Sequence, residues 1–287
     1  MATWFFVSDL HGNTRSYQKL FQAIKAERPE VIFLGGDFLP LGFAIPKCLN
    51  VFHQDFIHEY LVKQLVSLRS DLKNTYPRFF LIMGNDDPRF EEAAILDAAT
   101  QGIWEYIHNR KVEFKNFYVY GYANVPPTPF RLKDWERYDV SRYVDPGCIS
   151  PEEGVRSFPV SDQEKRYATI QNDLARLARD ENMDRAIFLF HAPPYETKLD
   201  LAAVEGKMID HVPLDQHLGS IAIRRFIESR QPLLTLHGHI HESARLSLSW
   251  RDLIGRTHCF SAAHDGPELA LIRFDPDNLE AATRQLV

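Results

Sequence analysis

Five short apolar runs, each followed within three residues by Asp, Asn or His side chains, constrain this chain more than any other feature of its sequence. The runs are rich in Phe, Ile, Val and Leu, which is typical of strands that are buried on both faces of a sheet. They occupy residues 4–8, 31–34, 79–83, 186–190 and 233–236. Ligands bind outside the carboxyl ends of the strands in open α/β sheets, so the polar side chains at these positions are candidates for a shared site.

Amphipathic patterns with a period near 3.6 residues separate these runs. Apolar residues three and four positions apart predict helices at 14–27, 53–74, 161–180 and 220–229. Asn13 is the expected N-cap of the first helix. Two further strands are expected at 257–260 and 268–274, joined by a turn at Asp265-Gly266. This alternation of strands and helices predicts a layered α/β architecture.

Length and composition bound the possible classes of protein. At 287 residues the chain fits a single domain over residues 1–287, with insertions at about 38–76 and 123–160 that contain few long apolar runs. The formal net charge of −6 gives no general attraction for phosphates, so nucleic acid is not expected as a partner. The three cysteines lie far apart, which fits a reducing compartment better than a disulfide framework. No membrane span or signal peptide is predicted, and we expect a cytoplasmic protein.

Side chains that bind metals follow all five predicted strands. Asp9 and His11 are two residues apart, as are His239 and His241, and the period of two in a strand places each pair on one side of the chain. Several glycines beside these residues leave room for the backbone to approach another group closely. Carboxylate, imidazole and amide oxygen together suit Mn²⁺, Fe or Zn²⁺ better than Ca²⁺.

These clusters resemble the signature of the calcineurin-like metallophosphoesterases. The family pattern runs D-x-H, G-D, G-N-x-D/E, a lone His and G-H-x-H, in that order. The matching residues here are Asp9-Leu10-His11, Gly36-Asp37, Gly84-Asn85-Asp86-Asp87, His191 and Gly238-His239-Ile240-His241. The motifs extend from residue 9 to residue 241, so the resemblance covers most of the chain.

The resemblance implies a four-layer α/β sandwich, in which two mixed β-sheets are flanked by helices, and a centre of two divalent metal ions (Mn, Fe or Zn). The ligands it implies for one ion are Asp9, His11 and His241. The ligands it implies for the other are Asn85, His191 and His239. Asp37 would bridge both ions. The implied activity is hydrolysis of a phosphate ester in a small phosphorylated substrate, through attack of a metal-bridging hydroxide.

The chain departs from the family pattern beside the motif Asn. Many members have a His there that is thought to help protonate the leaving group, whereas this chain has Asp86. An Asp with its ordinary pKa is mostly ionised at neutral pH and is a poor acid. Alternative donors are His53, His237, His264 or a metal-bound water. The expected catalytic residues are Asp37, Asn85 and Asp86.

Several functions of such a site stay open. A phosphodiester is mildly favoured, because the G-N-x-D form resembles the diesterase and nucleotidase branches of the family. The serine/threonine protein phosphatases are disfavoured, because Phe38-Leu39-Pro40 stands where they carry an Arg-containing motif. A phosphomonoesterase, a nuclease and a non-catalytic scaffold of the same fold are the alternatives. The negative net charge weighs against the nuclease, and the retention of all seven ligands weighs against the scaffold. The sequence predicts no oligomeric state.

Overall fold

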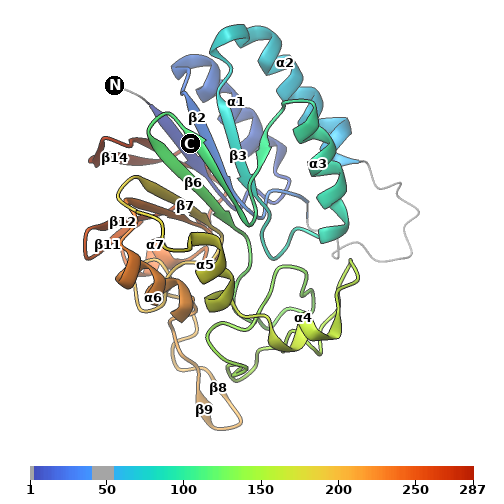
Figure 1. The fold of residues 1–287 in the computed structure, drawn as a ribbon, viewed down its shortest axis with the longest axis vertical. Helices are drawn as coiled ribbons and strands as arrows, with labels where there is room; N and C mark the ends of the chain where they lie inside the picture. The colour runs from blue at the N-terminus through green and yellow to red at the C-terminus, as the bar shows by residue number, and fades with distance from the viewer. Residues whose placement is uncertain (1–2, 41–54) are drawn as a thin grey trace.

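Two six-stranded sheets lie face to face with helices on their outer sides (Figure 1). The computed structural model describes residues 3–40 and 55–287. The first sheet contains β1 (Trp4–Val7), β2 (Val31–Gly35), β3 (Arg78–Ile82), β4 (Glu105–Tyr106), β13 (Ala270–Asp275) and β14 (Asn278–Leu286). The second contains β5 (Arg110–Phe114), β6 (Phe117–Tyr122), β7 (Ala186–Phe190), β10 (Leu234–His237), β11 (Arg251–Ile254) and β12 (Thr257–Ser261).

Both sheets are mixed, which confirms the predicted fold class. The first has the order β14-β13-β1-β2-β3-β4, with β1 to β4 parallel and β13 antiparallel to both of its neighbours. The second has the order β11-β12-β10-β7-β6-β5, with antiparallel strands at its two edges. A separate hairpin of β8 (Met208–Ile209) and β9 (Val212–Pro213) projects from the lower end in Figure 1.

Helices cover the outer face of each sheet. On the first sheet they are α1 (Thr14–Glu27), α2 (Lys63–Leu72) and α3 (Glu92–Thr100), and on the second α5 (Ile170–Ala178) and α6 (Ile221–Arg230). Two shorter helices, α4 (Asp162–Tyr167) and α7 (Ser243–Leu246), lie in the connecting segments. Asn13 caps α1 as predicted, because its side chain accepts hydrogen bonds from the backbone N–H groups of Arg15 and Ser16. A π-helical segment, Phe56–Val62, leads into α2. No helix in the described part of the chain has both the length and the apolar composition needed to cross a bilayer.

The two faces of β7 pack against different partners. Ile187 and Leu189 belong to the core that the two sheets share, whereas Phe188 and Phe190 pack in a second core with α5 and α6. This alternation follows from the strand period of two. The residue that comes next on the inward-facing row is His191, so the register of β7 directs this side chain toward the first sheet.

Two sequence-based predictions of local structure are wrong. The strands expected at 257–260 and 268–274 do not form a hairpin, because β12 pairs with β10 and β11 while β13 pairs with β1 and β14. The connecting residues pass from one sheet to the other, and Phe260 and Phe274 meet across the shared core. The helix expected at 161–180 is interrupted, because Thr169 has an extended backbone and caps α5 through the N–H of Asn172.

Candidate metal centre

The seven candidate ligands all lie between the two sheets, just beyond the carboxyl ends of five strands. The strands are β1, β2 and β3 of the first sheet and β7 and β10 of the second. Ligand atoms of six of the side chains fall into two groups, and within each group they lie within 4.8 Å of one another. The seventh, Asn85, is in hydrogen-bonding distance of the second group. The structure therefore brings all of the candidate ligands together.

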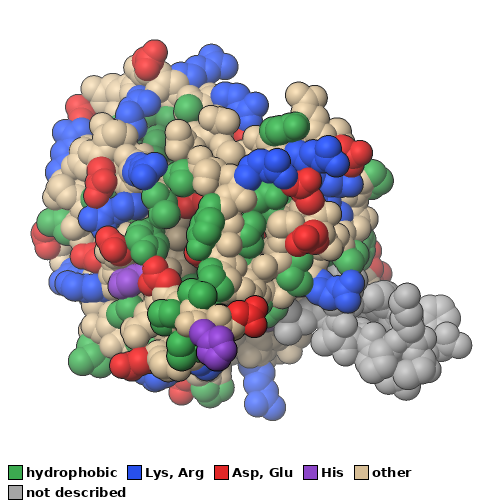
Figure 2. Space-filling view, turned by 90° about the horizontal axis from the view of Figure 1, so that it is seen from below, with side chains coloured by type: hydrophobic (Ala, Val, Ile, Leu, Met, Phe, Trp, Pro, Cys, Tyr) green, Lys and Arg blue, Asp and Glu red, His purple; other side chains and the backbone are tan. Residues whose placement is uncertain are grey.

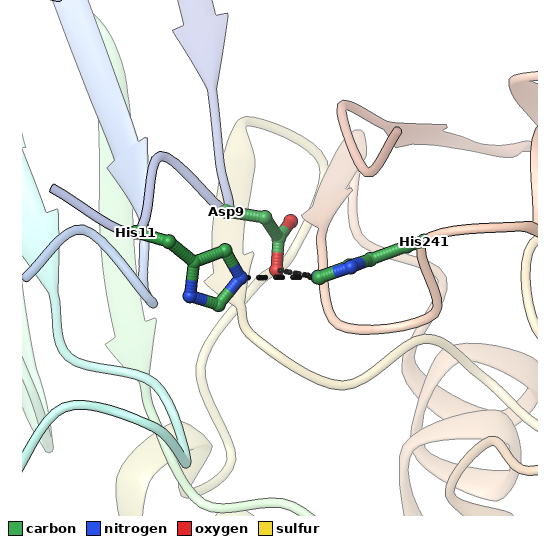
Figure 3. A group of neighbouring side chains, drawn as sticks. All are labelled: Asp9, His11 and His241. Atoms are coloured by element: carbon green, nitrogen blue, oxygen red, sulfur yellow. Dashed lines mark hydrogen bonds and ion pairs between the residues drawn. The ribbon is translucent and has the colours of Figure 1, made fainter. Parts of the chain in front are cut away.

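The first group consists of Asp9, His11 and His241 (Figure 3). His241 comes from the loop after β10, and its ring faces the two side chains that follow β1. Its Nε2 atom lies 3.3 Å from Asp9 Oδ1 and 3.3 Å from His11 Nε2. The other carboxylate oxygen of Asp9 is buried and has no hydrogen-bond partner among the described residues. A buried carboxylate oxygen without a donor is suited to a cation.

The second group consists of Asp37, His191 and His239. His191 Nε2 lies 3.0 Å from Asp37 Oδ2 and 3.0 Å from Asn85 Oδ1. The other ring nitrogen, Nδ1, donates to the carbonyl oxygen of Gly35 over 2.8 Å, so the neutral ring carries its lone pair on Nε2. Three acceptor atoms thus face one another in a buried place. Only a cation, either a proton or a metal ion, makes this arrangement favourable.

The pKa shifts of these residues have the same origin. Burial alone would lower the pKa of His191, but the charge and the hydrogen bond of Asp37 raise it to about 10. Burial likewise opposes the ionisation of Asp37, but His191 holds the pKa of that carboxyl below its ordinary value. His239 has no such hydrogen-bonded carboxylate, and burial and the charge of His191 lower its pKa to about 3. In the protein alone, a proton on His191 therefore satisfies the converging acceptors.

Asp37 connects the two groups. Its carboxylate also forms a third set of neighbouring ligand atoms with His11 and Asp86. The backbone N–H of Asp86 donates to Asp37 Oδ1 over 2.8 Å. On the other side of the centre, the backbone N–H of His239 donates to Asp9 Oδ1 over 3.0 Å. The two carboxylates that follow β1 and β2 of the first sheet are thus tied to backbone that carries further candidate ligands.

Backbone strain is concentrated at the same residues. Asp9, His11, Asp37 and His239 have φ angles of 58°, 43°, 51° and 72°, in the left-handed region that residues other than glycine rarely adopt. Such conformations cost on the order of 1–3 kcal/mol each and cluster at active and ligand-binding sites. Hydrogen bonds between the loops after β1 and β2 hold them, including Asp9 N–H to the oxygen of Gly36 and His11 N–H to the oxygen of Asp37.

Glycines make room for the ligands. A Cβ atom at Gly84 would lie 2.3 Å from Asp37 Oδ1, and one at Gly238 would lie 2.6 Å from Asp9 Oδ2. Both distances are shorter than a real Cβ contact, and the Gly84 contact falls on a buried side chain with no space to move. The two glycines therefore allow strand ends to approach the carboxylates as closely as this centre requires.

Asp86 lies at the rim of the centre. Its side chain is 29% exposed, and Asn85 Nδ2 donates to its carboxylate over 3.0 Å. Burial and the nearby charge of Asp37 raise the pKa of Asp86 to about 6. The pKa of this carboxyl is therefore closer to the range of a general acid than the ordinary pKa of Asp is.

Asp87 has a structural role that the sequence analysis missed. Its fully buried carboxylate accepts hydrogen bonds from the backbone N–H groups of Leu39 at 2.8 Å and Gly84 at 2.9 Å, and more weakly from that of Phe38 at 3.4 Å. These contacts join the loop after β2, which carries Asp37, to the loop after β3, which carries Asn85. The sequence feature that could have indicated this role is the final Asp of the Gly84-Asn85-Asp86-Asp87 motif.

Of the three histidines considered as alternative acids, the structure describes two. His237 lies on the opposite face of β10, where its Nδ1 donates to the oxygen of Ala192 and its ring stacks on Phe190. His264 Nε2 is 3.1 Å from the carboxylate of Glu268, at a hollow of about 340 Å³ that also borders Asp9 and His11. His53 lies outside the described residues.

A larger pocket of about 550 Å³ opens onto the centre from the other side. Its floor includes Asp37, Asp86 and His241, and its walls come mainly from the segments 126–148 and 195–221. No Lys or Arg is among the described residues that line it. Figure 2 views the end of the molecule where β8, β9 and α4 lie, and charged side chains of both signs are mixed with hydrophobic ones over this face.

Comparisons with known proteins agree with this geometry. A family model described as calcineurin-like phosphoesterase matches residues 3–243. A search of curated proteins gave no match.

Solved structures resemble the chain over nearly its whole length. One crystal structure has 16% sequence identity and a TM-score of 0.57, with 99% of this chain and 98% of that chain covered. The crystal structure of TT1561 from Thermus thermophilus has 15% identity and a TM-score of 0.53, with the same coverage of 99% and 98%. A dimetal phosphatase from Danio rerio has 12% identity and a TM-score of 0.48, with 95% and 91% covered. At such low identity, the first two similarities show a shared fold.

Proposed function

Because the chain belongs to the calcineurin-like phosphoesterase family, and is therefore a hydrolase of phosphoric esters, we propose that it cleaves a phosphodiester at a centre of two divalent metal ions. One observation carries the proposal. His191 Nε2, Asp37 Oδ2 and Asn85 Oδ1 converge in a buried place, with both oxygens 3.0 Å from the nitrogen, and only a cation stabilises three acceptors there.

The proposed ligands of one ion are Asp9, His11 and His241. The proposed ligands of the other are Asn85, His191 and His239. Asp37, which contacts both groups, is the proposed bridge. Imidazole, carboxylate and amide oxygen suit Mn²⁺, Fe or Zn²⁺. Two such ions, when bound, lower the pKa of a coordinated water and neutralise charge on a phosphate.

The side chains of this chain would direct the ligand atoms, stabilise charge on the phosphate and supply a proton. The hydrogen bond from His191 Nδ1 to Gly35 fixes the tautomer of the ring and keeps Nε2 directed at the centre. Asn85, which donates to Asp86, is placed to stabilise charge on the phosphate oxygens. Asp86 takes the position of the common family His and is the proposed proton donor to the leaving oxygen, because its carboxyl lies at the partly exposed rim of the centre.

A diester is favoured over a monoester by the charges around the centre. A monoester dianion carries one more negative charge than a diester anion. Neither the large pocket nor the smaller hollow has a Lys or Arg among its described lining residues, so neither cavity offers a described Lys or Arg to compensate that charge. The same lack of cations disfavours the nuclease alternative, since nucleic-acid binding depends on contacts between Lys or Arg and phosphates.

Hydrolysis of matched aryl substrates tests this proposal. With Mn²⁺, we expect bis(p-nitrophenyl) phosphate to be cleaved with a kcat/KM at least about 10-fold above that of p-nitrophenyl phosphate.

Asp37→Ala removes the bridge and is expected to lower kcat by about 10³-fold, in the range of losses seen when a key electrostatic group is removed. The exposed Asp180→Ala is the matched control and keeps wild-type turnover. Wild-type turnover by Asp37→Ala would overturn the assignment, and preference for the monoester would overturn the diester preference.

A further inference from the structure

The pocket beside the proposed centre has an apolar, aromatic wall. Phe130 and Tyr143 line it, and their side chains are 58% and 68% exposed. Tyr195 contributes a third ring, and Val140 and Leu218 add aliphatic surface. Large rings that stay exposed around a concave site provide apolar contact area for a ligand at low cost in conformational entropy.

The charges in the same pocket are negative. Asp145 and Asp215 enter it from two different segments of its wall. Burial and the nearby charge of Asp215 raise the pKa of Asp145. Asp215 is fixed in place, since it accepts from the Tyr195 hydroxyl over 2.6 Å and from the backbone N–H of His217 over 2.9 Å. A ligand group with negative charge would meet repulsion here.

Two arginines beside the wall are held by other partners. Arg224 donates to the backbone oxygens of Tyr195 and Glu196 from behind the wall and pairs with Glu228. Arg142 pairs with Glu152. Neither of them lines the pocket. Within the described residues, the pocket therefore lacks a Lys or Arg side chain that would neutralise an anionic ligand group.

We propose, on the premise of the function proposed above, that this pocket binds an uncharged aromatic group of the phosphodiester and discriminates against groups that carry further negative charge. The rings of Phe130 and Tyr143 supply the apolar contact, and Asp145 and Asp215 supply the repulsion. The substrate class is thus a phosphodiester with one charge, on its phosphate, and an aromatic ester group beside it.

A substrate series with one leaving group tests the pocket separately from the chemistry. The substrates are p-nitrophenyl phosphodiesters whose second ester group is methyl, phenyl or 3-carboxyphenyl. We expect kcat/KM for the phenyl ester to exceed that for the methyl ester about 10-fold, because burial of a ring is favourable. We expect the 3-carboxyphenyl ester to be about 10-fold slower than the phenyl ester, because of its charge near two carboxylates.

Single-residue variants show which side chains cause these differences in kcat/KM between the substrates. Tyr143→Ala is expected to reduce the phenyl-to-methyl ratio about 3-fold. Asp145→Lys is expected to reduce the preference for phenyl over 3-carboxyphenyl about 5-fold or more. Asp180→Lys makes the same change of charge at an exposed position outside the pocket and leaves both ratios unchanged.

A binding measurement keeps the pocket testable without turnover. Diphenyl phosphate and dimethyl phosphate are titrated into the protein by calorimetry, and we expect the diphenyl ester to bind about 10-fold more tightly, by contacts that Tyr143→Ala weakens. If no substrate is cleaved but this preference is found, the proposed function fails and the pocket inference stands. If all three substrates are cleaved within about 2-fold of one another, or the 3-carboxyphenyl ester is cleaved fastest, the pocket inference fails and the function stands. Absence of both cleavage and preferential binding overturns both.

Discussion

The candidate metal centre and the pocket beside it are built in opposite ways. The side chains of Asp9, Asp37 and His191 are at most 2% exposed, and they follow strands whose residues form the shared core. The pocket wall comes instead from irregular chain, and Phe130 and Tyr143 expose more than half of their side-chain surface. The difference teaches that the core fixes the position of the reactive groups, whereas the surface sets what can approach them.

The wall is nevertheless anchored. Lys133 and Glu136 form an ion pair in which both side chains are fully buried, and Thr128 donates to Glu136 from the same segment. Asp139 accepts hydrogen bonds from backbone N–H groups at the start of α6 and from Ser220. Buried polar contacts thus hold the wall in position, whereas apolar packing of the strands holds the centre in position. Burial raises the pKa of Glu136 to about 7 even beside Lys133.

The largest expected effect falls on the centre. His191→Ala removes a proposed ligand and is expected to lower metal content from two ions toward one per chain, with a loss of activity of at least about 10²-fold. Elemental analysis of the purified variant measures the stoichiometry. His258→Ala, far from the centre on β12, is the matched control and keeps both ions. A His191→Ala variant that keeps two ions would show that this residue is not a ligand.

The next effect concerns the support beneath the ligands. Asp87→Ala leaves buried backbone N–H groups of two loops without an acceptor, which is expected to lower the free energy of unfolding by about 1–3 kcal/mol. It also loosens Asp37 and Asn85, and losses of this kind reduce metal affinity about 10–100-fold. Denaturant unfolding and metal titration measure the two effects. Unchanged metal affinity in a destabilised variant would limit Asp87 to a role in folding.

The next effect depends on pH and on His237, on the buried face of β10 that points away from the site. Burial lowers the pKa of His237 to about 3, compared with an ordinary value near 6.5. Between these values the unfolded chain binds a proton that the folded chain does not, so stability falls as pH falls from about 6.5 toward 3, by up to about 1.4 kcal/mol per pH unit.

His237→Phe removes this titrating group. The variant is expected to be less stable at neutral pH, because Thr235 and Ala192 lose their partner. The dependence of its unfolding free energy on pH between about 6 and 4 should, however, be shallower than that of the wild type. Chemical denaturation at several pH values measures both slopes. Equal slopes would mean that His237 does not contribute to acid sensitivity.

The smallest effect is expected in the pocket wall. Leu218 is 37% exposed, and Leu218→Ala should change the free energy of unfolding by less than about 0.5 kcal/mol. Leu189 is fully buried in the shared core, and the same substitution there should cost about 2–5 kcal/mol. Thermal or denaturant unfolding of the two variants measures the contrast. Similar losses at both positions would remove the distinction between a rigid centre and a tolerant wall.

The sequence predicted some of the elements whose patterns are complete in themselves, although it missed the apolar strand β6 and the helix α3. β7 has the predicted bounds because 186–190 is apolar throughout, and α1 has them because Asn13 marks its start and apolar residues recur along one face. β5 was missed, since its half-exposed Arg110–Phe114 has no apolar run and is a strand only through pairing with β6. The false hairpin has the same cause, because an Asp-Gly turn signal does not reveal which sheet each flanking strand joins.

The sequence predicted those site residues whose positions are set by the ends of the strands. Five strands with ligands at their ends, together with the family resemblance, were enough to name the seven side chains that the structure brings together. Their roles as ligands stay a prediction. The support from Asp87 was not predicted, because it depends on backbone groups of two separate loops. Most of the side chains that line the pocket were not predicted either, since its wall depends on long-range contacts of segments without regular structure.

The alternation along β7 also limits how the length of this chain can vary. Inserting or deleting one residue between Ala186 and His191 would turn the imidazole toward α5 and α6 and place a phenyl ring between the sheets. Lengthening the segments that form the wall would not shift any strand. Relatives with the same chemistry should therefore differ in loop length around the pocket and keep the spacing of residues through their strands. The loops around the pocket are also where a designer who wants a new substrate can add or remove residues.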